Sequence, residues 1–181
     1  AEGTEYGVQL AGTAPRATIL QGGVATGNTS GVNIAPASLN AQLTISGTAT
    51  GAQHGVDTAG ANARIDITSS GVVTAGTGAA IRATGDPGVA TLVTSAGTIN
   101  GGGQGAFLGN GGNETFNVTG GRVQGNATGG AGTDTFAISG GLFAGGAFNW
   151  TTLAVTGGQW DVLAWPVGSV ETRTSTGRPP S

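Results

Sequence analysis

Apolar and polar residues alternate in several short segments of this chain. Residues 115–119 read TFNVT, and the same alternation returns at 135–139 (TFAIS) and at 152–156 (TLAVT). A period of two is typical of a strand with one buried face, and Val, Ile, Thr and Phe suit a pleated surface. No long segment combines a 3.6-residue period with capping residues. The pattern therefore predicts short strands and no helix.

A repeat joins these segments. The heptapeptides at 6–12 (YGVQLAG), 30–36 (SGVNIAP) and 54–60 (HGVDTAG) begin 24 residues apart (30 − 6 and 54 − 30). A fixed period in the twenties is the signature of a solenoid, in which each repeat forms one coil. Because the spacing then drifts, we expect outward rows of side chains not to stay in register. The less regular copies open at Ala79, Gly105 and Gly146.

Glycine pairs follow the predicted strands at 120–121, 140–141 and 157–158. Glycine reaches positive φ at little cost, so we expect each pair to end its strand and to turn the chain at a corner. Parallel crossovers are overwhelmingly right-handed. The sequence thus predicts an all-β protein whose residues 1–165 form a right-handed parallel β-helix (β-solenoid) of about seven irregular coils. Residues 166–181 are expected to be a polar, proline-containing tail or linker.

Aligning the copies predicts which side chains fill the interior. The aromatic residues are concentrated at one end, since eight of the nine lie at Phe107 or later. Aromatic side chains bury the most apolar area per residue, so we expect the C-terminal half to be the more stable. The expected columns are Phe116–Phe136–Leu153, Val118–Ile138–Val155 and Val123–Phe143–Trp160, with Ile19, Leu43, Val8, Val32 and Val56 continuing the inward rows.

The composition indicates a folded chain and excludes several kinds of site and partner. Only 8% of the residues are charged and the net charge is −3, whereas disorder goes with high net charge. The absence of cysteine excludes a disulfide framework and a thiolate zinc site. The six basic residues are dispersed arginines, so we expect no nucleic-acid partner. No apolar run is long enough for a transmembrane helix.

Two glycine-rich segments resemble calcium-binding nonapeptides. Residues 129–136 (GGAGTDTF) fit the pattern G-G-x-G-x-D-x-U, and residues 109–116 (GNGGNETF) are an approximate copy. The copies are 20 residues apart (129 − 109), whereas that motif needs tandem nine-residue repeats, and calcium takes six to eight oxygen ligands. We therefore expect Asp134 and Glu114 to be solvent-facing carboxylates at glycine-rich corners, with no metal bound.

The sequence offers little enzymatic chemistry. Only Glu114 and Asp134 are expected to stack on adjacent coils, and no basic residue accompanies them. His54 is the only histidine, and its position is held by Tyr6 and Ser30 in other copies, which is typical of a tolerant corner position. No nucleophile-elbow, metalloprotease or P-loop motif is present, so we expect no catalytic residue and no cofactor. The carboxylates are Glu2, Glu5, Asp57, Asp66, Asp86, Glu114, Asp134, Asp161 and Glu171.

Two tryptophans, Trp150 and Trp165, lie outside the predicted columns. If they are exposed near the last coil, they would either cover its open end or bind a partner. We favour capping, because the final coil of a solenoid must shield its unpaired edge.

The run at 109–141 (GNGGNETFNVTGGRVQGNATGGAGTDTFAISGG) resembles the passenger region of bacterial autotransporters, as do 152–162 (TLAVTGGQWDV) and 76–85 (GTGAAIRATG). The resemblance extends over residues 6–165. It implies a pertactin-like right-handed β-helix, an extracellular location at the bacterial cell surface, and adhesive, aggregative or virulence functions. Because residues 1–181 lack the family's C-terminal translocator barrel, the resemblance implies a passenger fragment, a processed passenger or a different β-helical surface protein. In the first two cases the full-length protein would carry an outer-membrane β-barrel covalently.

These patterns favour a non-enzymatic, surface-displayed or secreted passenger. We expect it to act as an adhesin or a structural spacer through multivalent contacts along a rod, with a ligand on a host or neighbouring cell. One alternative is a subunit of a self-assembling extracellular fibre. A further alternative is a carbohydrate-active β-helix enzyme.

Overall fold

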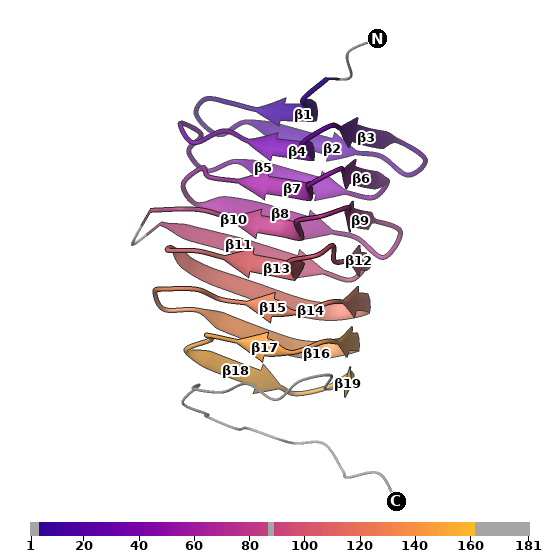
Figure 1. Ribbon diagram of the computed structural model, residues 1–181, viewed down its shortest axis with the longest axis vertical. Helices are drawn as coiled ribbons and strands as arrows, with labels where there is room; N and C mark the ends of the chain where they lie inside the picture. Colours follow the sequence, from indigo (N-terminus) through magenta and orange to yellow (C-terminus); the bar gives the residue numbers. More distant parts are fainter. Residues whose placement is uncertain (1–3, 87–88, 162–181) are drawn as a thin grey trace, which may run out of the picture.

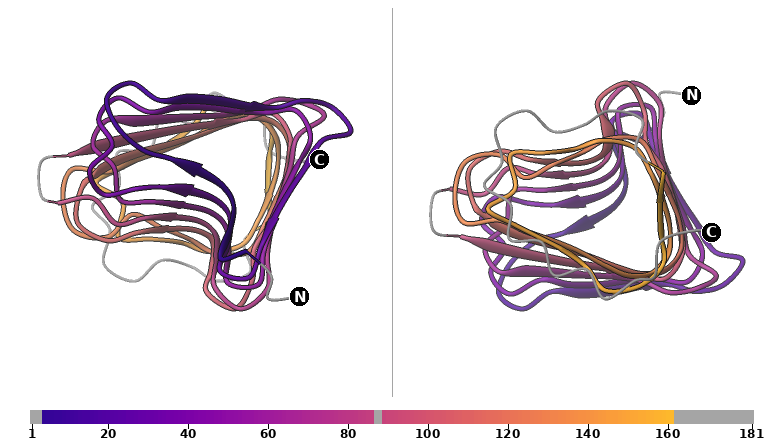
Figure 2. Two further views of the ribbon diagram at one scale, coloured as in Figure 1. Left: turned by 90° about the horizontal axis from the view of Figure 1, so that it is seen from above. Right: turned by 90° about the horizontal axis from the view of Figure 1, so that it is seen from below.

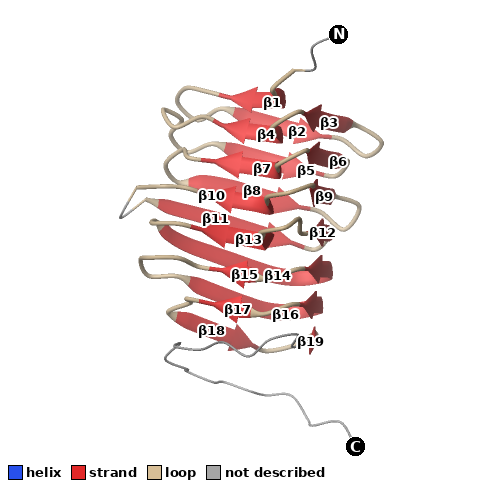
Figure 3. Cartoon of the chain, in the orientation of Figure 1, coloured by secondary structure: helices blue, strands red, loops and turns tan. Residues whose placement is uncertain are grey.

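The computed structural model describes residues 4–86 and 89–161, and every helix or strand assigned among them is a β-strand. The chain winds as a parallel β-solenoid whose coils stack along one axis (Figure 1). Figure 3 shows strands and loops only, and Figure 2 shows the coils enclosing a three-sided interior. The predicted fold class, a right-handed parallel β-helix, is confirmed. The expected boundary between residues 165 and 166 lies outside the described residues.

Each coil contributes strands to three faces. Face 1 consists of β1 (Tyr6–Leu10), β4 (Ser30–Ile34), β7 (His54–Thr58), β10 (Ala79–Ala83), β13 (Gly105–Gly109), β15 (Ala127–Thr128) and β17 (Ala147–Phe148). Face 2 consists of β2 (Arg16–Ile19), β5 (Gln42–Ile45), β8 (Ala63–Ile67), β11 (Ala90–Ser95), the first parts of β14 (Asn113–Gln124) and β16 (Thr135–Ala144), and β18 (Thr152–Val155). Face 3 consists of β3 (Val24–Gly27), β6 (Thr48–Gly51), β9 (Val72–Ala75), β12 (Thr98–Asn100), the last parts of β14 and β16, and β19 (Gln159–Asp161).

Between residues 4 and 161 the chain passes face 1 seven times, which gives about six full turns and a last described coil of β17, β18 and β19. The 24-residue repeat is confirmed at the start, where Tyr6 pairs with Ser30 and Ser30 with His54. The fourth coil differs from the expectation by one residue, because Ile81 pairs with Val56 at a separation of 25. The sequence alignment also missed the coil that opens near Ala127, between Gly105 and the last copy.

The predicted interior columns are confirmed. Phe116 pairs with Phe136 and Phe136 with Leu153, and the other two expected triplets pair in the same way. Each column continues through the earlier coils with aliphatic side chains, apart from Ser95. The column of Phe116 begins Ala17–Leu43–Ile65–Val93, that of Val118 begins Ile19–Ile45–Ile67–Ser95, and that of Val123 begins Ala25–Ala49–Val73–Ile99.

Aromatic rings fill the interior of the last coils. Phe116 stacks between Phe107 and Phe136, with ring centroids 5.1 and 5.3 Å apart. Trp150 stacks on Phe136 at 5.3 Å, and Phe143 meets Phe136 edge-on at 4.9 Å. Such pairs add attraction beyond the area they bury. The small Ala127 and Ala147 stand at the face 1 positions below Phe107, where Trp150 occupies the interior.

The glycine pairs turn the chain between faces 2 and 3, as predicted. Gly121, Gly141 and Gly158 each have positive φ. Two of the three strands do not end there, because β14 and β16 each run through the corner and pair on both faces. At Gly157 and Gly158 the strand does end, since β18 stops at Val155 and β19 starts at Gln159. A single glycine in this conformation bends the chain while the neighbouring residues keep their hydrogen bonds.

The repeated glycine of the first coils stands where two faces meet closely. A Cβ atom added to Gly31 would lie 2.5 Å from the backbone nitrogen of Thr50 and 2.9 Å from the carbonyl oxygen of Ala25, both on face 3. Gly7 and Gly55 meet face 3 residues in the same way. The absence of a side chain therefore lets the start of face 1 lie against the end of face 3.

Replacing Gly31 with Ala is expected to destabilise the protein by about 1–3 kcal/mol, because the methyl group would meet backbone that cannot move aside cheaply. Gly120→Ala is the matched control, since a Cβ there would make only ordinary contacts at 3.6 Å. Denaturant unfolding of both variants measures the difference. Equal stabilities would show that close approach does not explain the repeated glycine.

The C-terminal coils are expected to open later than the N-terminal coils at neutral pH, because their interior is aromatic. Amide hydrogen exchange resolved by peptide would compare residues 115–161 with residues 6–60. Slower exchange at 6–60 would contradict this expectation.

Candidate functional site

Outward side chains form continuous rows on faces 2 and 3. Residues that alternate with the buried columns pair from coil to coil, so the rows stay in register although the coil lengths vary, and the expectation that they would not is wrong. Paired strands place neighbouring members of a row about 4.8 Å apart. On face 3 the first four coils carry two uncharged rows, Val24–Thr48–Val72–Thr98 and Thr26–Thr50–Thr74–Asn100.

Face 2 carries a more polar pair of rows. Arg64 donates to Asp66 on the same strand at 3.0 Å, and both side chains are exposed. The rows are Arg16–Gln42–Arg64–Leu92–Thr115–Thr135–Thr152 and Thr18–Thr44–Asp66–Thr94–Asn117–Ala137–Ala154.

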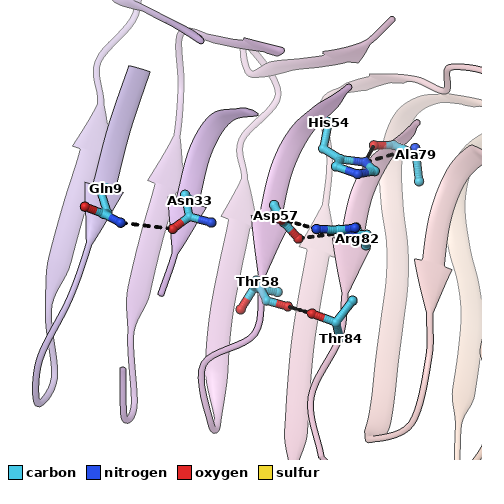
Figure 4. A network of polar contacts seen from close by, with 8 residues as sticks. All are labelled: Gln9, Asn33, His54, Asp57, Thr58, Ala79, Arg82 and Thr84. Atoms are coloured by element: carbon cyan, nitrogen blue, oxygen red, sulfur yellow. Dashed lines mark hydrogen bonds and ion pairs between the residues drawn. The ribbon is translucent and has the colours of Figure 1, made fainter. Parts of the chain in front are cut away.

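A polar ladder crosses the first four strands of face 1 (Figure 4). Gln9 Nε2 donates to Asn33 Oδ1 at 3.4 Å. The guanidinium of Arg82 donates two hydrogen bonds to the carboxylate of Asp57, at 2.8 and 2.6 Å. Donating these hydrogen bonds to Asp57 raises the pKa of Arg82 above its usual value. The bidentate geometry fixes both side chains, so the Asp57–Arg82 pair is a rigid polar feature of this face.

His54 lies at the first corner of the third coil and is only 3% exposed. Its Nδ1 atom is 3.2 Å from the backbone nitrogen and 3.0 Å from the carbonyl oxygen of Ala79, in the next coil. A Cβ at Gly78 would collide with the imidazole ring, so the ring is tightly enclosed. The side chain thus joins two coils at a corner.

Glu114 and Asp134 stack on adjacent coils, as predicted, but they do not face solvent. Glu114 is 0% exposed and Asp134 is 1% exposed. The backbone N–H of Glu114 donates to Asp134 Oδ1 at 2.8 Å. The expectation of solvent-facing carboxylates is wrong because side chains alternate between the interior and the surface along β16. Phe136 and Ile138 point inward, and Asp134, two residues before Phe136, points inward with them.

Burial and the neighbouring carboxyl change the ionisation of this pair. Loss of hydration, followed by the hydrogen bond and the charge of Asp134, raises the pKa of Glu114 to about 8. Glu114 is therefore protonated at neutral pH, and a protonated carboxyl donates a hydrogen bond that a carboxylate cannot.

The remaining carboxylates are dispersed. Asp66 lies in the third coil and Glu114 in the fifth, Asp57 is paired with Arg82, and Asp86 and Asp161 are exposed. Within 4–86 and 89–161 no three His, Asp or Glu side chains come together as a metal-binding group. Glu2 and Glu171 lie outside the described residues.

Trp150 is buried rather than exposed. Its side chain is 4% exposed, and Nε1 donates to the carbonyl of Ala127 at 3.0 Å. It fills the interior beside Phe136, so it neither caps the surface nor offers a binding site. Trp165 lies outside the described residues.

The fold thus defines a parallel β-solenoid. Comparison of the chain with protein-family profiles, with curated proteins and with solved structures gives no match. The described part of the chain contains no helix long and apolar enough to cross a membrane. The likeness to autotransporter passengers stays a prediction from the sequence.

The Asp57–Arg82 pair is expected to stabilise the stack of coils more than the Arg64–Asp66 pair. Asp57 is largely buried and is bound by Arg82 from the next coil. Arg64 and Asp66, in contrast, are both exposed and lie on one strand. Double-mutant cycles with Asp57→Asn and Arg82→Gln should give a coupling of about 1.5–3 kcal/mol. The matched cycle with Asp66→Asn and Arg64→Gln should give about 0.2–1 kcal/mol. Equal couplings in urea unfolding would contradict this ranking.

Proposed function

We propose that this chain is a non-enzymatic β-helical passenger, displayed on a bacterial surface or secreted, that acts as an adhesin or a structural spacer. The observation that carries the proposal is the register of the outward rows. Rows such as Thr26–Thr50–Thr74 repeat the same side chain at a spacing of about 4.8 Å along a stiff stack of coils. A surface of this kind suits many weak, equivalent contacts, whose sum gives avidity without a pocket.

Low charge supports contact with a large uncharged or weakly charged surface. Face 3 carries no charged side chain in its outward rows over the first four coils. The partner that fits this chemistry is a ligand on a host or neighbouring cell, reached by a passenger whose remaining chain is anchored in the outer membrane.

The open first coil favours the alternative of a self-assembling fibre. Strands β1, β2 and β3 each pair with a later strand on one side only, within the part of the chain that the structure describes. Leu20 and Val24 on this coil are also exposed. An unpaired strand edge is a template for another strand, which a second copy of this chain would supply.

Bead-bound protein tests the adhesin proposal. Because avidity multiplies weak contacts, binding of bacterial or host cells by protein-coated beads should exceed binding by the free protein by about 10²–10⁴-fold. Thr50→Glu on face 3 and Thr115→Glu on face 2 form a matched pair of charge insertions in outward rows. We expect one of them to reduce bead adhesion at least tenfold without changing the thermal midpoint.

The same preparation separates the alternatives. Adhesion no greater than that of beads carrying a protein of equal net charge would contradict the adhesin proposal. Concentration-dependent filaments in electron microscopy would favour the fibre. Release of reducing sugar from polysaccharides would favour the enzyme.

A further inference from the structure

Three oxygen atoms of the Glu114–Asp134 pair have no hydrogen-bond partner in the part of the chain that the structure describes. They are both carboxyl oxygens of Glu114 and Oδ2 of Asp134, and all three are inaccessible to solvent. A buried carboxylate oxygen without a donor is costly, and two adjacent carboxylates that are both ionised also repel each other. The backbone N–H of Glu114 donates to Asp134 Oδ1. The backbone N–H groups of Gly112 and Glu114 also lower the pKa of Glu114, but by less than burial and Asp134 raise it. The pair therefore needs a further positive group.

The backbone encloses the pair too tightly for another side chain. A Cβ added to Gly112 would lie 2.6 Å from Glu114 Oε1, and one added to Gly109 would lie 3.0 Å from Oε2. On the Asp134 side, a Cβ at Gly129 would lie 3.1 Å from Oδ2. These glycines, the same ones that suggested a calcium motif, leave room for two carboxyl groups and little else.

No basic side chain within residues 4–86 and 89–161 compensates the pair. Strands β11, β12, β13 and β18, which pack against β14 and β16, carry no titratable residue. The charged residues nearby in the chain are Asp86 before β11, Arg122 on β14 and Asp161 on β19, and all three are exposed. The smallest positive group that fits is a proton.

We propose that Glu114 and Asp134 share one proton inside the solenoid, and that loss of this proton loosens the corner between faces 1 and 2 in the fifth and sixth coils. In the closed state the O–H of the Glu114 carboxyl donates to Asp134 Oδ2. When the proton leaves to water, two carboxylates remain in contact in the interior, and they separate by drawing residues 109–114 and 129–135 toward solvent. The corner is thus held closed in acidic and neutral surroundings and released in alkaline ones.

The direction of the pH dependence follows from the two states. An unfolded glutamate has a pKa of about 4.3, whereas the pKa of Glu114 in the folded protein is about 8. The folded state therefore binds the extra proton between these values. The contribution of Glu114 to the free energy of unfolding is therefore largest below about pH 4.3. It falls as the pH rises and levels off above about pH 8.

Thermal and denaturant unfolding between pH 5 and pH 9.5 tests the proposal on the full chain. Linkage predicts that the unfolding equilibrium constant of the wild type rises by up to about tenfold per pH unit between pH 5 and 8, relative to Glu114→Gln. Glutamine keeps the shape and supplies an N–H to Asp134, so this variant should be the more stable one at pH 9. Asp66→Asn, which removes an exposed carboxylate, should follow the wild-type profile.

Two spectroscopic readouts locate the effect. The infrared band of a protonated carboxyl should be present in the wild type at pH 7 and absent from Glu114→Gln. At pH 9, exchange of the amides in 109–135 should be faster in the wild type than in that variant, while exchange in 30–60 should match. If Glu114→Gln does not fold, Asp134→Asn should move the loss of the band to lower pH, since the amide donates to Glu114 and removes the like charge while the burial of Glu114 remains.

Parallel pH profiles of the wild type and Glu114→Gln, or the absence of the protonated band at pH 7, would overturn the proposal. So would a rise of the wild-type thermal midpoint at pH 8 on adding calcium that Glu114→Gln does not show. That result would assign the pair to a cation instead of a proton.

Discussion

The parallel ladder of backbone hydrogen bonds between successive coils is the constraint on which this structure depends. It joins each strand to the strand one coil further along and holds the pairing in register over most of the described chain. Because the ladder fixes which residues lie above one another, like side chains gather into columns inside and into rows outside. Differences in coil length are taken up in the loops between faces, so they leave the columns and rows intact.

The contents of the columns and the glycines at the corners adapt this ladder along the chain. Coils with aliphatic columns use separate strands for each face, whereas β14 and β16 run around a corner at a single left-handed glycine. At the other corner, Gly7, Gly31 and Gly55 allow face 1 to start directly against face 3. The same loss of side chains near Glu114 and Asp134 makes room for a pair of acids in the interior.

The sequence was sufficient to predict the solenoid, because period-two alternation and a fixed repeat both survive in the residues themselves. It also predicted the aromatic columns, where Phe116, Phe136 and Leu153 follow the same motif. It did not predict the Asp57–Arg82 pair, because one extra residue before Ala79 displaces Arg82 from the position opposite Asp57 in a strict 24-residue alignment. The burial of Glu114 and Asp134 was missed for a different reason. A carboxylate beside glycines suggests a solvent-exposed corner. Only the two-residue spacing from Asp134 to Phe136 and on to Ile138 would have indicated that Asp134 points into the interior.

The uneven distribution of aromatic rings has a consequence for optical measurements on this protein. All three tryptophans belong to the last third of the sequence, and the two that are described lie among the phenylalanines of the final coils. The first hundred residues carry a single chromophore, Tyr6, at their outer edge. Tryptophan fluorescence therefore reports on one end of the rod, and a transition that melts only the aliphatic end would leave the signal unchanged.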